Sequence, residues 1–226
     1  MSLADNISSN GTFVVQQLQI VNDQIALGDT SVSSGTGTVA VGFNAVATGN
    51  YANALGSNSL ASGLGSTSIG DSEASAQASL AIGSSNSDNT QYTTASAAYS
   101  IAIGAAAQAT GARSIAIGPA ESGANKLGAV ASGLSCIAIG ESVKTAGNNN
   151  IVIGNKTTDN QATPFTGNII LNASGGNITA PAQANSFYVK PIRNFADGGG
   201  GAQAANCPTG FKTLFYNSTT NEIVWN

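Results

Sequence analysis

Few residues of this chain have the types and spacing that support chemistry. The 226 residues include no histidine, which excludes His-based catalytic triads and histidine metal sites. Asp71 and Glu73 form a close acidic pair, which we interpret as two solvated loop acids. The glycines of Gly35-Thr36-Gly37 precede no helical pattern, so they do not indicate a phosphate loop. We therefore expect no catalytic residue, no metal ligand and no cofactor, and predict that the protein is not an enzyme.

The two cysteines, Cys136 and Cys207, lie far apart in the sequence and in unlike contexts. A disulfide framework in a chain of this size needs more cysteines than two. We therefore predict two unpaired thiols.

Charge is sparse, because only 8% of the residues are charged and the formal net charge is -4. Seven basic residues are scattered along the chain, whereas nucleic-acid and anionic-membrane surfaces need clusters of Lys and Arg. No apolar run approaches the ~20 residues of a membrane span, and the first residues do not resemble a signal peptide. We therefore expect neither a nucleic-acid partner nor membrane insertion.

A tetrad of the form Ile-Ala-Ile-Gly recurs about every fourteen residues. The tetrads end at Gly28, Gly42, Gly56, Gly70, Gly83, Gly104, Gly118, Gly140, Gly154 and, with Asn in place of Gly, Asn172. We expect Asn172 to keep the turn, since Asn also tolerates positive φ. A second glycine often follows seven residues later, so one coil consists of two short strands with a turn after each.

The apolar positions within a tetrad alternate, which is the period of a strand and not of a helix. Ile115 and Ile117 share one face, and Ala116 shares the other with its neighbours Ser114 and Gly118. The sequence therefore predicts an all-β, parallel β-roll (a solenoid) over residues 23–180 with coils of about fourteen residues. The longer intervals between tetrads predict bulging loops near residues 84–98, 120–133 and 156–167.

The two faces of the tetrad strands suggest different roles. We expect the isoleucines to fill the roll, opposite small inward residues of the other half-coil such as Ala45, Ala47, Ala107 and Ala109. The tetrad alanines would then point outward, either as a harmless exposed ladder or as a subunit interface. We favour the interface, because a thin roll buries little surface alone, and assign it to Ala40, Ala54, Ala81, Ala102, Ala116 and Ala138.

The runs Ser114–Gly118 and Cys136–Gly140 resemble the head repeats of trimeric autotransporter adhesins of Gram-negative bacteria. The resemblance covers roughly residues 23–172. It implies a left-handed parallel β-roll, a homotrimer packed around a three-fold axis, and a surface used for adhesion.

The C-terminal part departs from that family, with no recognisable neck, heptad stalk or membrane anchor. The runs Asn185–Asn194 and Leu214–Asn226 are similar to segments of fibre and surface proteins of large DNA viruses and tailed phages. We therefore predict the head of a trimeric viral fibre on the virion surface, which binds a host surface receptor, with a glycan favoured. The alternatives are a bacterial adhesin head at the cell surface, a structural virion spacer without a receptor, and a polysaccharide-degrading fibre. The receptor-binding residues are not identified.

The two ends of the chain read as caps of the roll. Residues 1–22 are expected to form an N-terminal strand or cap, and residues 181–226 a small C-terminal β cap. Its hairpin would pair Leu214–Asn217 with Glu222–Trp225 around the turn Ser218–Asn221. The aromatic residues of this region form either the core of the cap or a platform for stacking sugars: Phe187, Tyr188, Phe195, Phe211, Phe215, Tyr216 and Trp225.

Overall fold

The computed structural model describes residues 23–122, 126–156, 166–173, 184–190, 214–217 and 222–225. These residues form strands and turns, and none of them is helical. The chain divides into two units, Met1–Lys190 and Pro191–Asn226. The first holds a parallel β-solenoid, as the sequence predicts.

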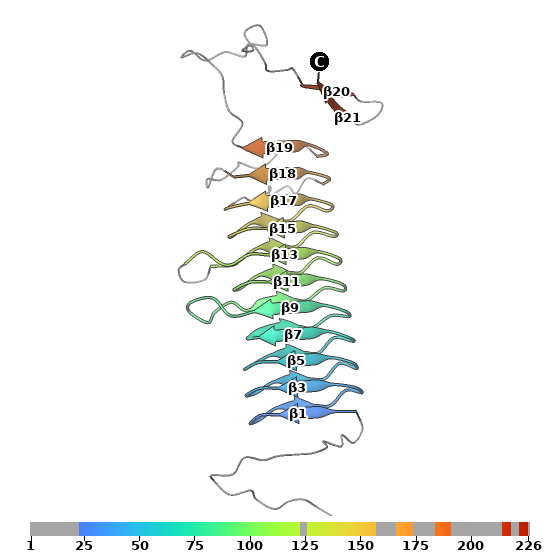
Figure 1. Cartoon of the computed structure of the whole chain (residues 1–226), viewed down its shortest axis with the longest axis vertical. Helices are drawn as coiled ribbons and strands as arrows, with labels where there is room; N and C mark the ends of the chain where they lie inside the picture. Colours follow the sequence, from blue (N-terminus) through green and yellow to red (C-terminus); the bar gives the residue numbers. More distant parts are fainter. Residues whose placement is uncertain are drawn as a thin grey trace, which may run out of the picture. The chain divides into compact units, whose positions relative to one another are not determined.

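Sheet A of the solenoid contains eleven parallel strands, stacked one above another (Figure 1). Each of its strands but the last two pairs with the tetrad strand of the next coil in strict register, so that Ala102, for example, lies beside Ala116. In order, the strands are β1 (Ile25–Leu27), β3 (Val39–Val41), β5 (Asn53–Leu55), β7 (Thr67–Gly70), β9 (Leu80–Gly83), β11 (Ile101–Ile103), β13 (Ile115–Ile117), β15 (Ile137–Ile139), β17 (Ile151–Gly154), β18 (Ile169–Asn172) and β19 (Phe187–Lys190).

Sheet B contains eight shorter parallel strands, one from each of the first eight coils. Its small inward residues are buried as expected, and Ala45, Ala47, Ala107 and Ala109 have no exposed surface. The strands are β2 (Val32–Ser33), β4 (Val46–Ala47), β6 (Leu60–Ala61), β8 (Ser72–Ala74), β10 (Thr93–Ala95), β12 (Gln108–Ala109), β14 (Val130–Ala131) and β16 (Lys144–Thr145).

Where a tetrad ends in glycine, the backbone conformation and the close approach of the next coil both require a glycine there. Gly104, for example, has φ of +126°, a conformation that L side chains rarely adopt. A β-carbon at Gly104 would also lie 2.6 Å from the carbonyl oxygen of Gly118 in the next coil. Asn172 pairs with Gly154 but is not among the residues with positive φ, so the expectation that it repeats the glycine turn is wrong.

The C-terminal end of the roll is filled by larger side chains. Val152 and Ile170 are fully buried where earlier coils carry alanine, and Tyr188, the next residue in register, packs against the same core. Among the described residues, no strand of sheet B stands opposite β17, β18 or β19. The last strand of sheet A, β19, ends at Lys190.

The second unit contains the predicted hairpin. β20 (Leu214–Asn217) pairs antiparallel with β21 (Glu222–Trp225), with Leu214 opposite Trp225, in the predicted residues. The segment 1–22, Phe195, Phe211 and Cys207 lie outside the described residues, and the side chains of Phe215, Tyr216 and Trp225 are not described either. The choice between an aromatic cap core and a sugar platform therefore stays a prediction for this unit.

The glycine column leads to a test of the turn geometry. We expect Gly104→Ala to lower the free energy of unfolding by about 2 kcal/mol or more, since backbone strain of this kind costs about 1–3 kcal/mol and the contact with Gly118 adds to it. Gly65→Ala is the matched control, because Gly65 has φ of +63° but nothing within 4 Å of its β-carbon position. Its loss should be near 1 kcal/mol. Equal losses in denaturant titrations would contradict the role given to stacking.

Candidate functional site

The tetrad alanines lie inside the roll and not on its surface. Ala40, Ala54, Ala81, Ala102, Ala116 and Ala138 are each 0% exposed within a single chain. The prediction that they point outward is therefore wrong, and they have no exposed surface to offer to a subunit interface. The interior between the two sheets is narrow, so it accepts the methyl group of alanine and turns the larger isoleucine side chains outward.

The outer face of sheet A consequently carries two rows of apolar side chains that run along the whole sheet. The row at the third tetrad position is apolar in all eleven strands and includes Leu27, 52% exposed, and Ile153, 39% exposed. In register order it is Leu27, Val41, Leu55, Ile69, Ile82, Ile103, Ile117, Ile139, Ile153, Leu171 and Val189.

The row at the first tetrad position is apolar in nine of its eleven residues, with Asn53 and Thr67 as the exceptions. Neither row contains a charged residue. At ~4.8 Å between strands, the rows are ~48 Å long. A continuous apolar face of this length is typical of a protein–protein interface. We call this surface the isoleucine face.

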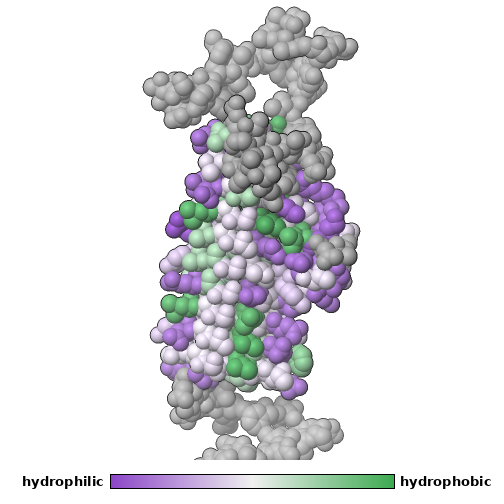
Figure 2. All heavy atoms as spheres, turned by 180° about the vertical axis from the view of Figure 1, so that it is seen from behind, coloured by the Kyte–Doolittle hydropathy of each residue, from purple (hydrophilic) through white to green (hydrophobic). Residues whose placement is uncertain are grey.

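The outer face of sheet B differs from the isoleucine face. Its single outward row begins with Val32, Val46 and Leu60 and continues with mostly polar residues, among them Glu73, Gln108 and Lys144. Seen from behind the view of Figure 1, apolar residues form separate patches among polar and small side chains (Figure 2). This side is suited to contact with water.

The first two insertions predicted from the longer repeats are confirmed in their positions. The connections from β9 to β10 and from β13 to β14 leave the roll on the same side (Figure 1). They touch each other, because the side-chain amide of Asn86 donates a hydrogen bond to the carbonyl oxygen of Lys126 at 3.3 Å. The third insertion, near residues 156–167, is described only in part.

An ion pair links the second insertion to the start of the third. The Lys156 ammonium donates to the Glu121 carboxylate at 2.6 Å, and Lys126 lies 3.9 Å from the same carboxylate. The hydrogen bond and charge of Lys156 lower the pKa of Glu121, and the same contact raises the pKa of Lys156. Because both groups are at the surface, this pair aligns the insertions more than it stabilises the fold.

The insertion from β9 to β10 is held in shape by Asn86, a side chain only 5% exposed. The side-chain oxygen Oδ1 of Asn86 accepts hydrogen bonds from the backbone N–H groups of Thr90 at 2.9 Å and Gln91 at 3.1 Å. Its amide group also donates to the Thr90 hydroxyl at 3.1 Å. One buried side chain therefore fixes the path of the loop.

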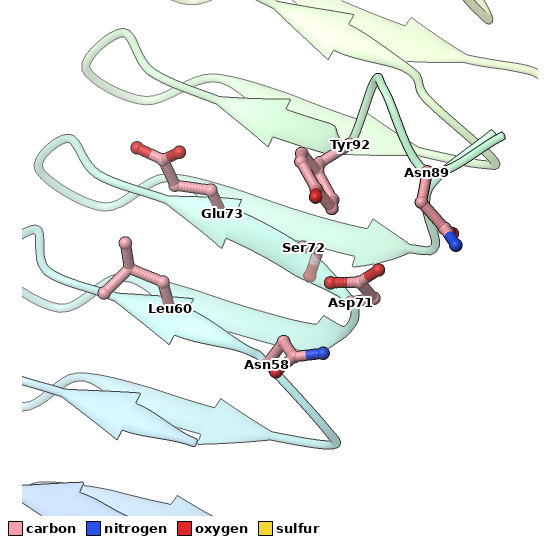
Figure 3. Close-up of a pocket in the computed structure, with 7 residues that line it drawn as sticks. All are labelled: Asn58, Leu60, Asp71, Ser72, Glu73, Asn89 and Tyr92. Carbon is pink, nitrogen blue, oxygen red and sulfur yellow. The ribbon is translucent and has the colours of Figure 1, made fainter. Parts of the chain in front are cut away.

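A pocket of about 590 Å³ lies beneath this loop, on the outer side of sheet B (Figure 3). Asp71 and Glu73 both line it, and Glu73 belongs to strand β8 rather than to a loop. The interpretation of these two residues as solvated loop acids is therefore wrong for Glu73. The other lining residues are Asn58, Leu60, Ser72, Asn89 and Tyr92.

Other candidate chemistry is limited in the described part of the chain. Cys136 is a free, fully buried thiol whose sulfur lies 2.7 Å from the carbonyl oxygen of Gly147, in agreement with the prediction for this cysteine. The described residues contain no group of three or more His, Cys, Asp or Glu side chains placed to hold a metal ion. None of them forms a helix long and apolar enough to cross a membrane.

Comparison with known protein families agrees with this geometry. The model of the YadA head domain repeat matches residues 25–45, 47–72 and 95–120, about a third of the chain. The roll therefore contains YadA head repeats. No curated protein matches the chain. The matched ranges do not reach the C-terminal segment, so its similarity to viral fibre proteins stays a prediction.

The role of Asn86 can be tested by limited proteolysis. We expect Asn86→Ala to expose the loop 84–92 to cleavage at least about tenfold faster, because the backbone N–H groups of Thr90 and Gln91 would lose a partly buried hydrogen-bond partner, which costs about 1–3 kcal/mol. Ser87→Ala, an exposed change in the same loop, is the control and should leave cleavage unchanged. Equal protection of both variants would show that Asn86 does not hold the loop.

Proposed function

We propose that this chain is the head of a homotrimeric surface adhesin, in which the isoleucine face is buried between three copies. The observation that carries the proposal is the third-position row, which is apolar in all eleven strands and partly exposed in the single chain. Exposure of such a face to water would cost roughly 25 cal/mol of free energy per Å² of apolar surface.

A further copy of the same roll fits this face better than an unrelated partner. The side chains repeat at the strand spacing along the whole sheet, so a second roll offers apolar rows with the same period and length. The trimer, rather than a dimer, is what the resemblance to adhesin head repeats implies. The match to the YadA head repeat supports the resemblance on which this choice rests.

Attachment is the function that this assembly serves best. Burying the outer side of sheet A would leave the insertions and the mixed polar and apolar outer face of sheet B on the outside of each copy. Three copies of any weak site would then act together and raise avidity without new contacts. The YadA head match favours a bacterial cell surface over the virion surface preferred from the sequence. Enzymatic activity has no part in the proposal.

The assembly can be tested by light scattering of the intact chain. We expect a mass three times the chain mass of 22.2 kDa for the wild type and 22.2 kDa for Ile117→Lys, because three buried ammonium groups without partners would meet at the interface. Gln108→Lys is the matched control, since Gln108 lies on the outward row of sheet B, where Lys144 already occurs. A monomeric wild type, or dissociation of both variants, would overturn the interface.

The attachment function needs its own measurement. Beads coated with the wild-type trimer should bind epithelial cells or extracellular matrix, and beads coated with the folded Ile117→Lys monomer should bind at least about tenfold less through lost avidity. Circular dichroism confirms that the variant keeps its β structure. Absence of binding by an intact trimer to all such surfaces would refute the adhesin function while leaving the assembly in place.

A further inference from the structure

The pocket beneath the 84–92 loop arises from two neighbouring irregularities of the repeat. Only Asp71 and Ser72 lie between Gly70 and Glu73, whereas three residues lie between Gly56 and Leu60, the residue with which Glu73 pairs. The turn after Gly70 is therefore one residue shorter than the turn after Gly56. The next coil, after Gly83, instead contains the insertion that carries Asn89 and Tyr92. A short turn below a long one leaves the hollow that these residues line.

The walls of this pocket are rigid. Leu60, Ser72 and Glu73 belong to strands β6 and β8, and Asn86 holds the loop that carries Asn89 and Tyr92. The interior side of the short turn is also fixed, since the hydroxyl of Ser68 donates to the carbonyl oxygen of Ser72 at 2.7 Å. A ligand would therefore meet a largely preformed site, which lowers the entropic cost of binding.

The polar groups of the pocket offer both acceptors and donors. The side chains of Asp71 and Glu73 have no hydrogen bond or ion pair with any described residue, so their carboxylates are available as acceptors. The side-chain oxygen Oδ1 of Asn58 accepts from the side-chain amide of Asn44 at 3.1 Å, and Oδ1 of Asn89 accepts from the Ser85 hydroxyl at 2.6 Å. No hydrogen bond with a described residue uses the amide NH2 groups of Asn58 and Asn89, so these groups are available as donors.

An aromatic ring completes the site. The Tyr92 side chain is 46% exposed and lies over Ser72, on the side toward Glu73 (Figure 3). A half-exposed tyrosine presents an apolar ring face together with a hydroxyl group. Such a ring suits a ligand that has one apolar face and polar groups around its edge.

The charge of this part of the chain selects among such ligands. Residues 1–112 contain no Lys or Arg, while their acidic residues are Asp5, Asp23, Asp29, Asp71, Glu73 and Asp88. Anionic ligands would meet two unpaired carboxylates and no basic group from this half of the chain. Sialylated, uronic and sulfated sugars are therefore disfavoured by like-charge repulsion.

We propose that this pocket binds one uncharged or amine-bearing sugar unit of a surface glycan. Sugar hydroxyls both donate and accept, as the carboxylates and amides of the site require, whereas a lysine ammonium group of a protein partner only donates. The volume of about 590 Å³ lies within the range of small-ligand sites. The proposal rests on the adhesin function, and the pocket, lined by sheet B and its turns, stays open when the isoleucine face is buried.

The test uses the trimer of the intact chain and defined oligosaccharides in isothermal titration calorimetry and saturation-transfer NMR. The probes are lactose, an N-acetylglucosamine trimer and a glucosamine trimer, with sialyllactose and a heparin hexasaccharide as anionic controls. We expect binding of at least one of the first three and none of the last two. Lactose and the glucosamine trimer distinguish neutral from amine-bearing recognition.

Variants assign the binding to the pocket. Tyr92→Ala should weaken binding about tenfold through loss of the ring contact, and Glu73→Gln should weaken it measurably. Tyr99→Ala is the matched control, because Tyr99 is a similarly exposed tyrosine that does not line the pocket, and it should leave binding unchanged. All three variants should keep the wild-type mass.

The outcomes separate this inference from the adhesin proposal. If the trimer adheres to cells but binds none of the uncharged or amine-bearing probes, the pocket proposal is wrong and the adhesin function stands. Equal loss in Tyr92→Ala and Tyr99→Ala would also overturn it. Binding of a lysine-rich peptide that depends on Glu73, without any sugar binding, would replace the glycan with a cationic protein partner.

Discussion

The narrow space between the two sheets of the roll is filled mainly by alanine and serine, with somewhat larger side chains such as Thr93 and Val143 at a few positions. This narrow space follows from coils of about fourteen residues, in which strands of two to four residues are joined by tight turns. Close packing of such an interior leaves no room for isoleucine, whose insertion would force the sheets apart. The isoleucines of each tetrad therefore point outward, and a chain that looks apolar by composition keeps much of its apolar surface on the outside.

That arrangement links the fold to assembly. An interior built mostly of methyl and hydroxymethyl groups buries little apolar surface per coil, so a single roll gains modest stability from its own core. Burial of the isoleucine face against other copies can supply the remaining stability. The C-terminal coils also show that the size of the interior side chains follows the space between the sheets. Where sheet B has no described strand, Val152, Ile170 and Tyr188 fill the interior in place of alanine.

Much of the fold could be predicted from the sequence, because the repeat contains it. The spacing of the tetrad glycines located the coils, and the long steps located the insertions. The pattern of Leu214–Trp225 located the hairpin. Period two alone, however, cannot say which face of a strand is inside when both faces are apolar. The deciding quantity was the interior volume, which excludes Ile117 and admits Ala116.

The pocket was missed for a different reason. Its residues come from three coils, and Asp71 and Glu73 looked like ordinary surface acids when read along the chain. The available signal was the thirteen-residue step from Gly70 to Gly83, followed directly by a long one. In a solenoid, such neighbouring irregularities come together in space although each is only a local change. Regular coils supply the scaffold, and departures from the repeat supply the places where a ligand can be held.

The most direct test of this account is thiol reactivity at three neighbouring positions in a Cys207→Ser background that retains the buried Cys136. We predict that Gln108→Cys reacts rapidly with maleimide in every state. Ala116→Cys should stay protected in every folded state, and Ile117→Cys should be protected in the assembly but reactive after dilution to single chains. Rapid reaction of Ile117→Cys in the assembled protein, or of Ala116→Cys in the folded chain, would contradict the orientation of the two faces and the burial of the isoleucine face between copies.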